Sequence, residues 1–181
     1  GLERLLAVHH QTKKAVPVAL GARLISDALE GLTYAHELSD YEGNELRIVH
    51  RDVSPQNIFV NYNGVVKLLD FGIAKASTHV VETRTGIIKG KYAYIAPEQA
   101  LGYEIDGRAD IWSMGVVLWE VLAGQRLFKS NNEIATLNQT LKADIPPPSS
   151  KNPEVPEELD AICLKALERD TSERYESSAD F

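Results

Sequence analysis

The chain has 181 residues, of which 44% are hydrophobic and 25% are charged. This composition can fill one hydrophobic core and excludes a disordered chain. Its net charge of −7 disfavours a chain-wide nucleic-acid or anionic-membrane surface. The single cysteine, Cys163, excludes an internal disulfide and indicates a reducing compartment. Apolar runs are too short for a membrane span, and the lone methionine, Met114, suggests an excerpt from a longer polypeptide.

The first half of the chain predicts a helix followed by a small hairpin. The helix should run from about residue 17 to 38, because apolar residues recur at every fourth position, namely Leu20, Leu24, Ala28 and Leu32. A polar insert at 39–45 follows it. Two β-rich runs, 58–61 and 65–69, flank Tyr62-Asn63-Gly64, which predicts a tight turn between two strands.

The second half predicts a long loop and three helices. Residues 70–97 show little periodicity, and a loop of that length in a compact domain is usually functional. The stretch 109–122 is apolar on more than one face and should form a buried helix that stops at Gly124. A polar helix is expected at 132–141 and a final amphipathic helix after Pro156.

Three short motifs then follow one another at spacings that carry chemical information. They are His50-Arg51-Asp52 with Asn57, Asp70-Phe71-Gly72, and Ala96-Pro97-Glu98. Each motif alone is unremarkable, but the ordered set is typical of protein kinases. The chain resembles the C-terminal lobe of a eukaryotic-like (Hanks-type) bacterial serine/threonine protein kinase over nearly all of its 181 residues. The resemblance implies an α+β, mostly α fold, in which a small β-hairpin bears the catalytic and metal residues.

The resemblance also implies roles for the polar residues of these motifs. Asp52 matches the carboxylate that orients and deprotonates the substrate hydroxyl. Asn57 and Asp70 match the residues that hold the metal bound to ATP, and an amide and a carboxylate oxygen suit Mg²⁺, with Mn²⁺ as an alternative. Protein hydroxyls are the implied substrates, and the implied activity is transfer of the γ-phosphoryl group.

A second set of residues matches the switch of kinases that are phosphorylated on their activation loop. Thr83 and Thr85 correspond to autophosphorylated threonines, and Arg51 and Lys75 to the cations that would pair with the phosphate. An alternative is that both threonines are ordinary loop residues. Autophosphorylation would bring two kinase copies together as a dimer.

Two positions depart from the family pattern. Serine/threonine kinases usually have lysine where this chain has Ser54, and threonine where it has Lys91. One cation and one hydroxyl are therefore present in exchanged places. We expect Lys91 to supply the positive charge that Ser54 lacks, and the alternative is a solvent-exposed Lys91.

The remaining matches are expected to be structural: His50, Phe71, Gly72, Glu98, Asp110 and Arg174. Among them, Glu98 and Arg174 should form a buried ion pair, and Asp110 should anchor the backbone of the catalytic loop. Trp112, Trp119 and Cys163 are expected in the core.

The family's glycine-rich phosphate loop is missing, because no two glycines of this chain are separated by one residue. We therefore expect residues 1–181 to be one kinase lobe, incomplete at both ends and inactive alone. The rival functions are a pseudokinase scaffold and a small-molecule phosphotransferase. The expected setting is cytoplasmic, without nucleic-acid or membrane contact from this segment, whereas the full protein could be anchored elsewhere.

Overall fold

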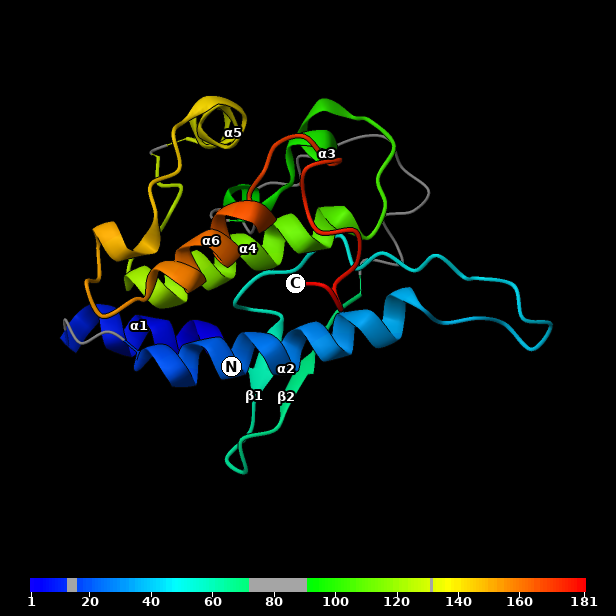
Figure 1. Cartoon of the computed structure of the whole chain (residues 1–181), viewed down its shortest axis with the longest axis horizontal. Coiled ribbons are helices and arrows are strands. Elements are labelled where there is room, and N and C mark those ends of the chain that lie inside the picture. The colour runs from blue at the N-terminus through cyan, green and yellow to red at the C-terminus, as the bar shows by residue number, and fades with distance from the viewer. Residues whose placement is uncertain (13–15, 72–90, 131) are drawn as a thin grey trace.

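The computed structural model of the chain describes residues 1–12, 16–71, 91–130 and 132–181, without the side chains of 10–12 and 91 (Figure 1). The described part is mostly helical and holds one two-stranded antiparallel sheet, which confirms the predicted fold class. In chain order the elements are α1 (Leu2–Thr12), α2 (Val18–His36), β1 (Ile58–Val60), β2 (Val66–Leu68), the 3₁₀ helix η2 (Lys91–Tyr94), α3 (Pro97–Leu101), α4 (Arg108–Ala123), α5 (Glu133–Lys142), the 3₁₀ helix η3 (Pro148–Ser150) and α6 (Glu157–Ala166).

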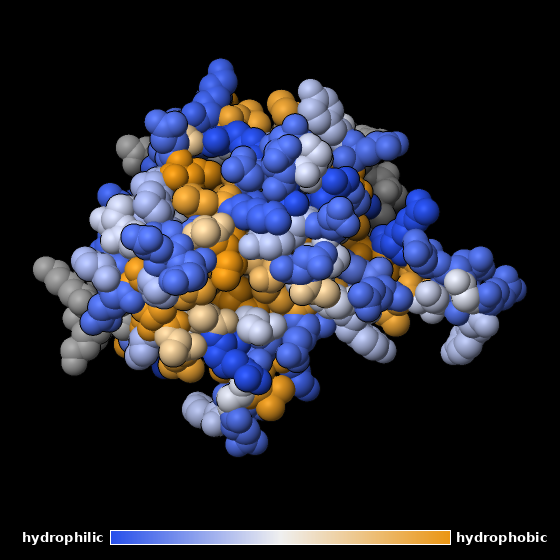
Figure 2. Space-filling view, in the orientation of Figure 1, coloured by the Kyte–Doolittle hydropathy of each residue, from blue (hydrophilic) through white to orange (hydrophobic). Residues whose placement is uncertain are grey.

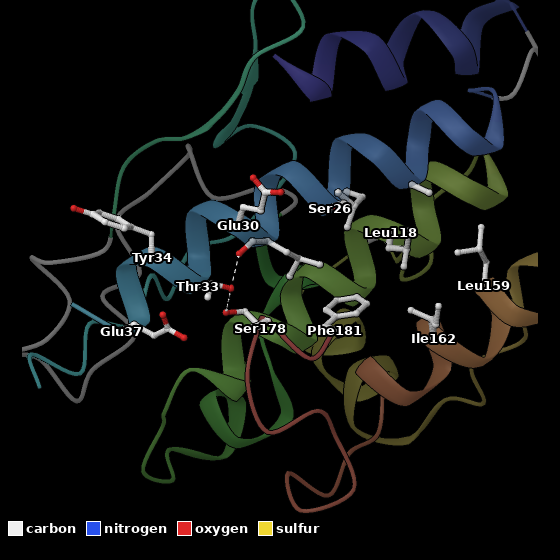
Figure 3. Close-up of a pocket in the computed structure, with 14 residues that line it drawn as sticks. Ser26, Glu30, Thr33, Tyr34, Glu37, Leu118, Leu159, Ile162, Ser178 and Phe181 are labelled. Carbon is white, nitrogen blue, oxygen red and sulfur yellow. Dashed lines mark hydrogen bonds between the residues drawn. The ribbon is translucent and has the colours of Figure 1, made fainter. Parts of the chain in front are cut away.

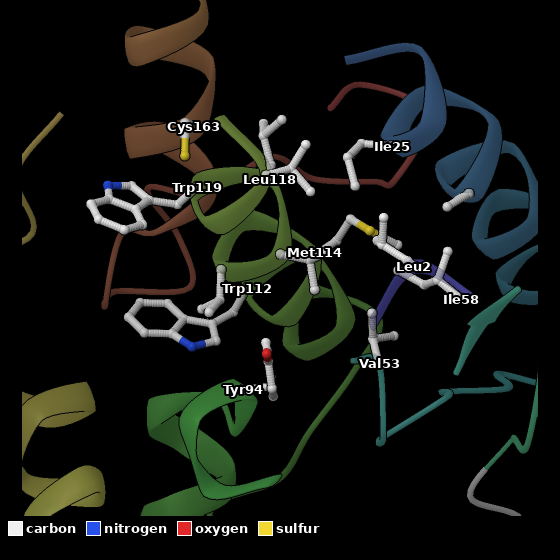
Figure 4. Close-up of a cluster of buried hydrophobic side chains, with 14 of the residues drawn as sticks. Leu2, Ile25, Val53, Ile58, Tyr94, Trp112, Met114, Leu118, Trp119 and Cys163 are labelled. Carbon is white, nitrogen blue, oxygen red and sulfur yellow. The ribbon is translucent and has the colours of Figure 1, made fainter. Parts of the chain in front are cut away.

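Helix α4 forms the centre of the molecule. Every residue from Ala109 to Leu122 is buried, as the apolar residues on several of its faces predicted. It packs against α2 and α6, and its side chains leave the helix in different directions (Figure 4). The helix ends at Gly124, which adopts the left-handed conformation with φ 68° that the predicted stop requires.

Helix α2 lies along α4 and buries most of the predicted apolar stripe. Leu24, Ala28 and Leu32 are 5%, 1% and 0% exposed, whereas Leu20, the first residue of the stripe, is 48% exposed. At the next residue, Gly21, an added Cβ would lie only 2.6 Å from a methyl carbon of Val121. The α2 backbone therefore touches α4 at Gly21, and the neighbouring Leu20 stays at the surface. The helix ends at His36, two residues earlier than expected.

The two strands form the predicted hairpin, but each is shorter than its β-rich run. Ile58 lies opposite Leu68 and Val60 opposite Val66. The turn is closed by the Asn61 side chain, whose Oδ1 accepts the N–H groups of residues 63 and 65 at 2.9 Å. One face of the hairpin packs on α1 and α2, which holds its opposite face in a defined orientation.

Helix α1 and the two 3₁₀ helices were not predicted from the sequence pattern, and neither was the local structure of two further segments. Helix α3 begins inside the expected loop, with Pro97 in its first turn and Gln99 accepting the N–H of Ala96 at 3.0 Å. In the polar insert, Ser39 and Glu45 form an isolated β-bridge. Short local hydrogen bonds of this kind carry little hydrophobic signal, which is why periodicity missed both segments.

The two predicted C-terminal helices are confirmed. Asn132 caps α5 by accepting the N–H of Ala135 at 2.7 Å. Helix α6 follows Pro156 and buries Cys163 and Ala166 against the core. No helix among the described residues is long and apolar enough to cross a membrane.

Arg174 connects the C-terminal segment to α3. Its guanidinium donates two hydrogen bonds of 2.7 and 2.8 Å to the Glu98 carboxylate and a third of 3.0 Å to the Arg108 carbonyl. It also lies 5.2 Å over the Trp112 ring. The arginine and glutamate are 3% and 7% exposed. Because removal of one partner leaves an uncompensated buried charge, such a loss typically costs ~3–5 kcal/mol.

Candidate active site

The segment His50-Arg51-Asp52, the candidate catalytic loop, is anchored by Asp110, a buried residue in the first turn of α4. The Asp110 carboxylate accepts the backbone N–H of His50 at 2.7 Å and that of Arg51 at 2.8 Å. Arg51 has φ 63°, a backbone conformation that costs free energy and persists only where the surroundings impose it. The two hydrogen bonds to Asp110 supply that constraint and set the direction in which Asp52 leaves the loop.

The His50 ring links the catalytic loop to the segment that follows β2. Its Nδ1 accepts the N–H of Asp52 at 3.3 Å, so its Nε2 carries the hydrogen and donates it to the Leu69 carbonyl at 3.0 Å. The ring also lies 4.4 Å from the Phe71 ring, between centroids. Both nitrogens of His50 are thus engaged with the backbone, which leaves this side chain a supporting position rather than one that faces a substrate.

Asn57 is oriented by Asp52. The amide nitrogen of Asn57 donates to the backbone oxygen of Asp52 at 2.7 Å and to its carboxylate at 3.2 Å. The amide oxygen therefore faces away from Asp52 and is available as a ligand. The backbone oxygen of Asn57 accepts the N–H of Leu69 at 2.8 Å, which places Asn57 beside the end of β2.

Asp70 follows Leu69 directly and is exposed, with φ 57°. Its strained backbone lies at the same end of the hairpin as Asn57. An exposed carboxylate and an oriented amide oxygen fit a hard cation that keeps several waters or phosphate oxygens. Among the described residues, no group of three or more His, Cys, Asp or Glu side chains is placed to hold a metal ion.

An apolar surface lies next to these polar residues. Phe59 is 42% exposed and Leu69 is 41% exposed, whereas Ile58, on the other face of the hairpin, is fully buried. Phe59 pairs with Lys67, two residues before Leu69, so Phe59 and Leu69 lie on the same face. An exposed apolar face beside oxygen ligands suits a flat ring that carries phosphates.

The structure does not describe several of the predicted site residues. Gly72, Lys75, Thr83 and Thr85 lie outside the described residues, and the side chain of Lys91 does too. Ser54 is 2% exposed, and its hydroxyl has no hydrogen-bond partner within the described part of the chain.

The sequence analysis missed a buried polar cluster beneath η2. The Tyr94 hydroxyl donates to Glu120 Oε2 at 2.8 Å, and the Arg126 guanidinium donates to the same oxygen at 3.2 Å and contacts the Tyr94 hydroxyl. Ser113 donates to the Tyr94 carbonyl at 2.7 Å. These bonds fasten η2 to α4. A glutamate within an apolar helix was the signal that could have revealed the cluster, because a buried carboxyl group needs hydrogen-bond partners.

Comparison with known proteins agrees with this geometry. The family described as protein kinase domain matches residues 2–179. The tyrosine-protein kinase MasK of Myxococcus xanthus is 48% identical over 92% of this chain and 26% of its own length. The serine/threonine-protein kinase PknB of Mycolicibacterium smegmatis is 38% identical over 87% of this chain and 24% of its own. The serine/threonine-protein kinase Pkn1 of Myxococcus xanthus is 41% identical, with 91% and 24% covered.

The chain therefore belongs to the protein kinase family, and its fold is that of a C-terminal kinase lobe. It spans about a quarter of the length of the curated relatives that it matches. Protein kinases use ATP and Mg²⁺.

The cluster at Glu120 predicts a pH-dependent stability. Burial raises the pKa of Glu120 to about 8, against an ordinary value of 4.5. Between about pH 5 and 8 the folded protein retains this proton while the unfolded chain has released it, so stability falls as the pH rises. In the full-length protein, Glu120→Gln should remove that fall. We expect the melting temperature of the variant minus that of the wild type to increase by several °C between pH 5 and pH 8. For a protein domain of this size, a stability change of 1 kcal/mol shifts the melting temperature by about 2–4 °C.

The matched control is Glu158→Gln, which alters an exposed glutamate on α6. Its melting temperature should follow the wild type at every pH. If the difference between Glu120→Gln and the wild type is the same at pH 5 and pH 8, Glu120 is ionised throughout and the prediction is wrong.

Proposed function

We propose that the full-length protein is a serine/threonine kinase that transfers the γ-phosphoryl group of Mg·ATP to protein hydroxyls, and that residues 1–181 form the C-terminal lobe of its kinase domain. One observation carries the proposal: hydrogen bonds from the Asn57 amide orient it relative to Asp52, and the Asn57 carbonyl is bonded to the end of β2. Phosphoryl transfer needs aligned groups and counter-charge more than covalent chemistry by the protein.

In this proposal Asp52 receives the substrate hydroxyl. Its carboxylate accepts from the Asn57 amide through one oxygen, Oδ2. A hydroxyl donating to the carboxylate would be held in one direction, and its proton would pass to Asp52 as the oxygen attacks the phosphorus atom. Asp52 is half-buried, so part of its surface remains accessible to such a hydroxyl.

Asn57 and Asp70 would hold the metal ion, which would neutralise charge on the phosphate oxygens when bound. The apolar face formed by Phe59 and Leu69 would contact the base of the nucleotide. The sequence contains no glycine-rich loop to cover the phosphates, so the 181 residues alone should not catalyse transfer.

The assignment of serine and threonine as the phosphorylated residues rests on the sequence. Pro55 in the catalytic loop and Tyr94 in η2 match serine/threonine kinases, and two of the relatives named above carry that designation. The similarity to a protein named as a tyrosine kinase favours tyrosine as the second candidate acceptor. We further propose a cytoplasmic kinase domain that autophosphorylates its activation loop between two copies of the protein.

Replacing either carboxylate should abolish transfer by the full-length protein. Asp52→Asn removes the proton acceptor and Asp70→Asn weakens metal binding, so each should lower the rate by at least about 10²-fold. The measurement is transfer of labelled phosphate from ATP, followed by identification of the phosphorylated amino acid. Asp27→Asn, at a surface pair with Arg23, is the matched control and should keep full activity.

The three rival functions separate in this experiment. A wild-type protein that folds but transfers no phosphate would be a pseudokinase scaffold, and one that phosphorylates only small molecules would be a small-molecule phosphotransferase. Phosphotyrosine as the product would replace serine and threonine as acceptors. Transfer by the 181-residue chain alone would contradict the expected need for a second lobe.

The proposed activation switch depends on Thr83 and Thr85. After incubation of the full-length kinase with Mg·ATP, mass spectrometry should find phosphate on one or both. Replacing both with alanine should lower activity about tenfold or more, because a phosphate there would pair with Arg51 and Lys75. Arg51→Ala should make the activity insensitive to that replacement. A fully active enzyme with an unmodified loop would rule the switch out.

We further propose that Lys91 supplies the positive charge that other serine/threonine kinases carry at the position of Ser54. Substitutions in the full-length protein test this exchange of roles. Lys91→Thr should lower the rate on the order of 10²-fold by removing charge stabilisation in the transition state. Ser54→Lys should introduce a competing ammonium group, and the double exchange should recover much of the loss. An unchanged rate in Lys91→Ala would show that Lys91 is only a surface residue.

A further inference from the structure

A stripe of three polar residues runs along one face of the buried helix α4. Asp110, Ser113 and Glu120 are separated by three and seven positions, so they share a face of the helix. The residues between them are apolar, and Leu118, for example, lines an apolar hollow of about 700 Å³ together with Ile162 (Figure 3). Because buried polar groups need partners, the partners of the stripe show what it holds in place.

The stripe holds three segments in order along the helix. Asp110 accepts from the backbone of the candidate catalytic loop, and Ser113 donates to the Tyr94 carbonyl of η2 at 2.7 Å. Glu120 accepts from the Tyr94 hydroxyl at 2.8 Å and from the Arg126 guanidinium at 3.2 Å. At 1.5 Å per residue, the step from Asp110 to Glu120 places Arg126 about 15 Å along the helix from the loop.

A contact from α1 also places Arg126 near the loop that carries Asp52. Gln56, which follows Asp52 in the same loop, donates from Nε2 to Glu3 Oε1 at 2.9 Å. Burial lowers the pKa of Arg126, and the negative charge of Glu3 partly opposes this effect. Arg126 is thus within electrostatic range of a residue that contacts the candidate catalytic loop.

Arg126 is a fixed cation with unused hydrogen-bond donors. Its Nη1 donates to Glu120 and contacts the Tyr94 hydroxyl, whereas Nε and Nη2 donate no hydrogen bond within the described part of the chain. The Tyr94 ring lies 5.6 Å from the guanidinium carbon, and the arginine side chain is 36% exposed. Nε and Nη2 form a planar fork that matches a carboxylate.

The partner of Arg126 inside the protein does not cancel its charge. Burial raises the pKa of Glu120 to about 8, so at pH 7 most of this glutamate carries its proton and is neutral. A half-buried cation beside a neutral acid has lost part of its hydration without gaining a full counter-charge. An anion that binds from the solvent would supply that charge.

We propose that Arg126 is a specificity-determining residue that binds an acidic side chain of the protein substrate within about five residues of the phosphorylated hydroxyl. An extended substrate advances about 3.3 Å per residue, so a distance of about 15 Å corresponds to about four or five residues. A carboxylate there would accept two parallel hydrogen bonds from the guanidinium, and a lysine would be repelled. The effect on transfer rests on the proposed kinase function, whereas selective binding of an acidic peptide does not.

The test uses the full-length protein and sets of peptides with serine, threonine or tyrosine as the acceptor. Within a set, glutamate, glutamine or lysine stands at one of the five positions on either side of the acceptor. The measurement is kcat/KM for phosphoryl transfer. At one of these positions at least, the wild type should favour glutamate over lysine by about tenfold or more, as expected for hydrogen bonds between charged groups.

Substitutions at Arg126 assign this preference. Arg126→Glu should reverse it in favour of lysine at the same position, and Arg126→Lys should keep its direction but weaken it, because lysine lacks the planar fork. Arg126→Gln should abolish it and decides the question if Arg126→Glu does not fold. The matched control is Arg23→Glu, at an exposed arginine of α2 paired with Asp27, which should keep the wild-type preference.

Binding gives a second readout that does not need transfer. The same peptides with alanine in place of the acceptor are titrated by fluorescence anisotropy, and those with glutamate at the preferred position should bind most tightly. Selective binding without any transfer would refute the proposed function alone. Transfer without a preference for glutamate, or with one that Arg126→Glu and Arg126→Gln leave intact, would overturn the role of Arg126. Absence of both transfer and selective binding would contradict both proposals.

Discussion

A buried carboxylate on the central helix organises the candidate active site of this lobe. Asp110 accepts three hydrogen bonds, from the backbone of His50, from the backbone of Arg51 and from the His36 ring. A carboxylate fully removed from water is costly unless its oxygens are satisfied. The backbone N–H groups of the candidate catalytic loop donate to these oxygens. The same hydrogen bonds hold Arg51 in its strained backbone conformation.

The apolar surroundings of α4 make this arrangement rigid. Because α4 is buried along its length between α2 and α6, a group in its first turn cannot move without disturbing the core. Apolar side chains also gather where these helices meet at the surface (Figure 2). The same helix carries Glu120, which fastens η2 through Tyr94. One helix thus sets both the catalytic loop and a neighbouring segment of the chain.

Much of the fold could be predicted from the sequence, and the sequence also singled out the candidate site residues. Helix α2 has strong apolar periodicity, α4 is apolar on several faces, α6 is amphipathic, and the hairpin has a turn sequence between two β-rich runs. The exposure of Leu20 and the short helix α3 were not predicted, because they depend on close backbone contact at Gly21 and on local capping at Gln99. Neither effect appears in a hydrophobic pattern.

The sequence by itself determined the protein family and the positions of Asp52, Asn57 and Asp70, because motif spacing along the chain is independent of folding. The resemblance had also pointed to Asp110 and to the pair of Glu98 and Arg174. Only the tertiary structure decided which other polar groups join them. His36 meets Ser178, and Glu120 meets Tyr94, across long stretches of chain. Hydrogen bonds require atoms within about 3 Å in correct orientation, and packing alone brings such distant residues to that separation.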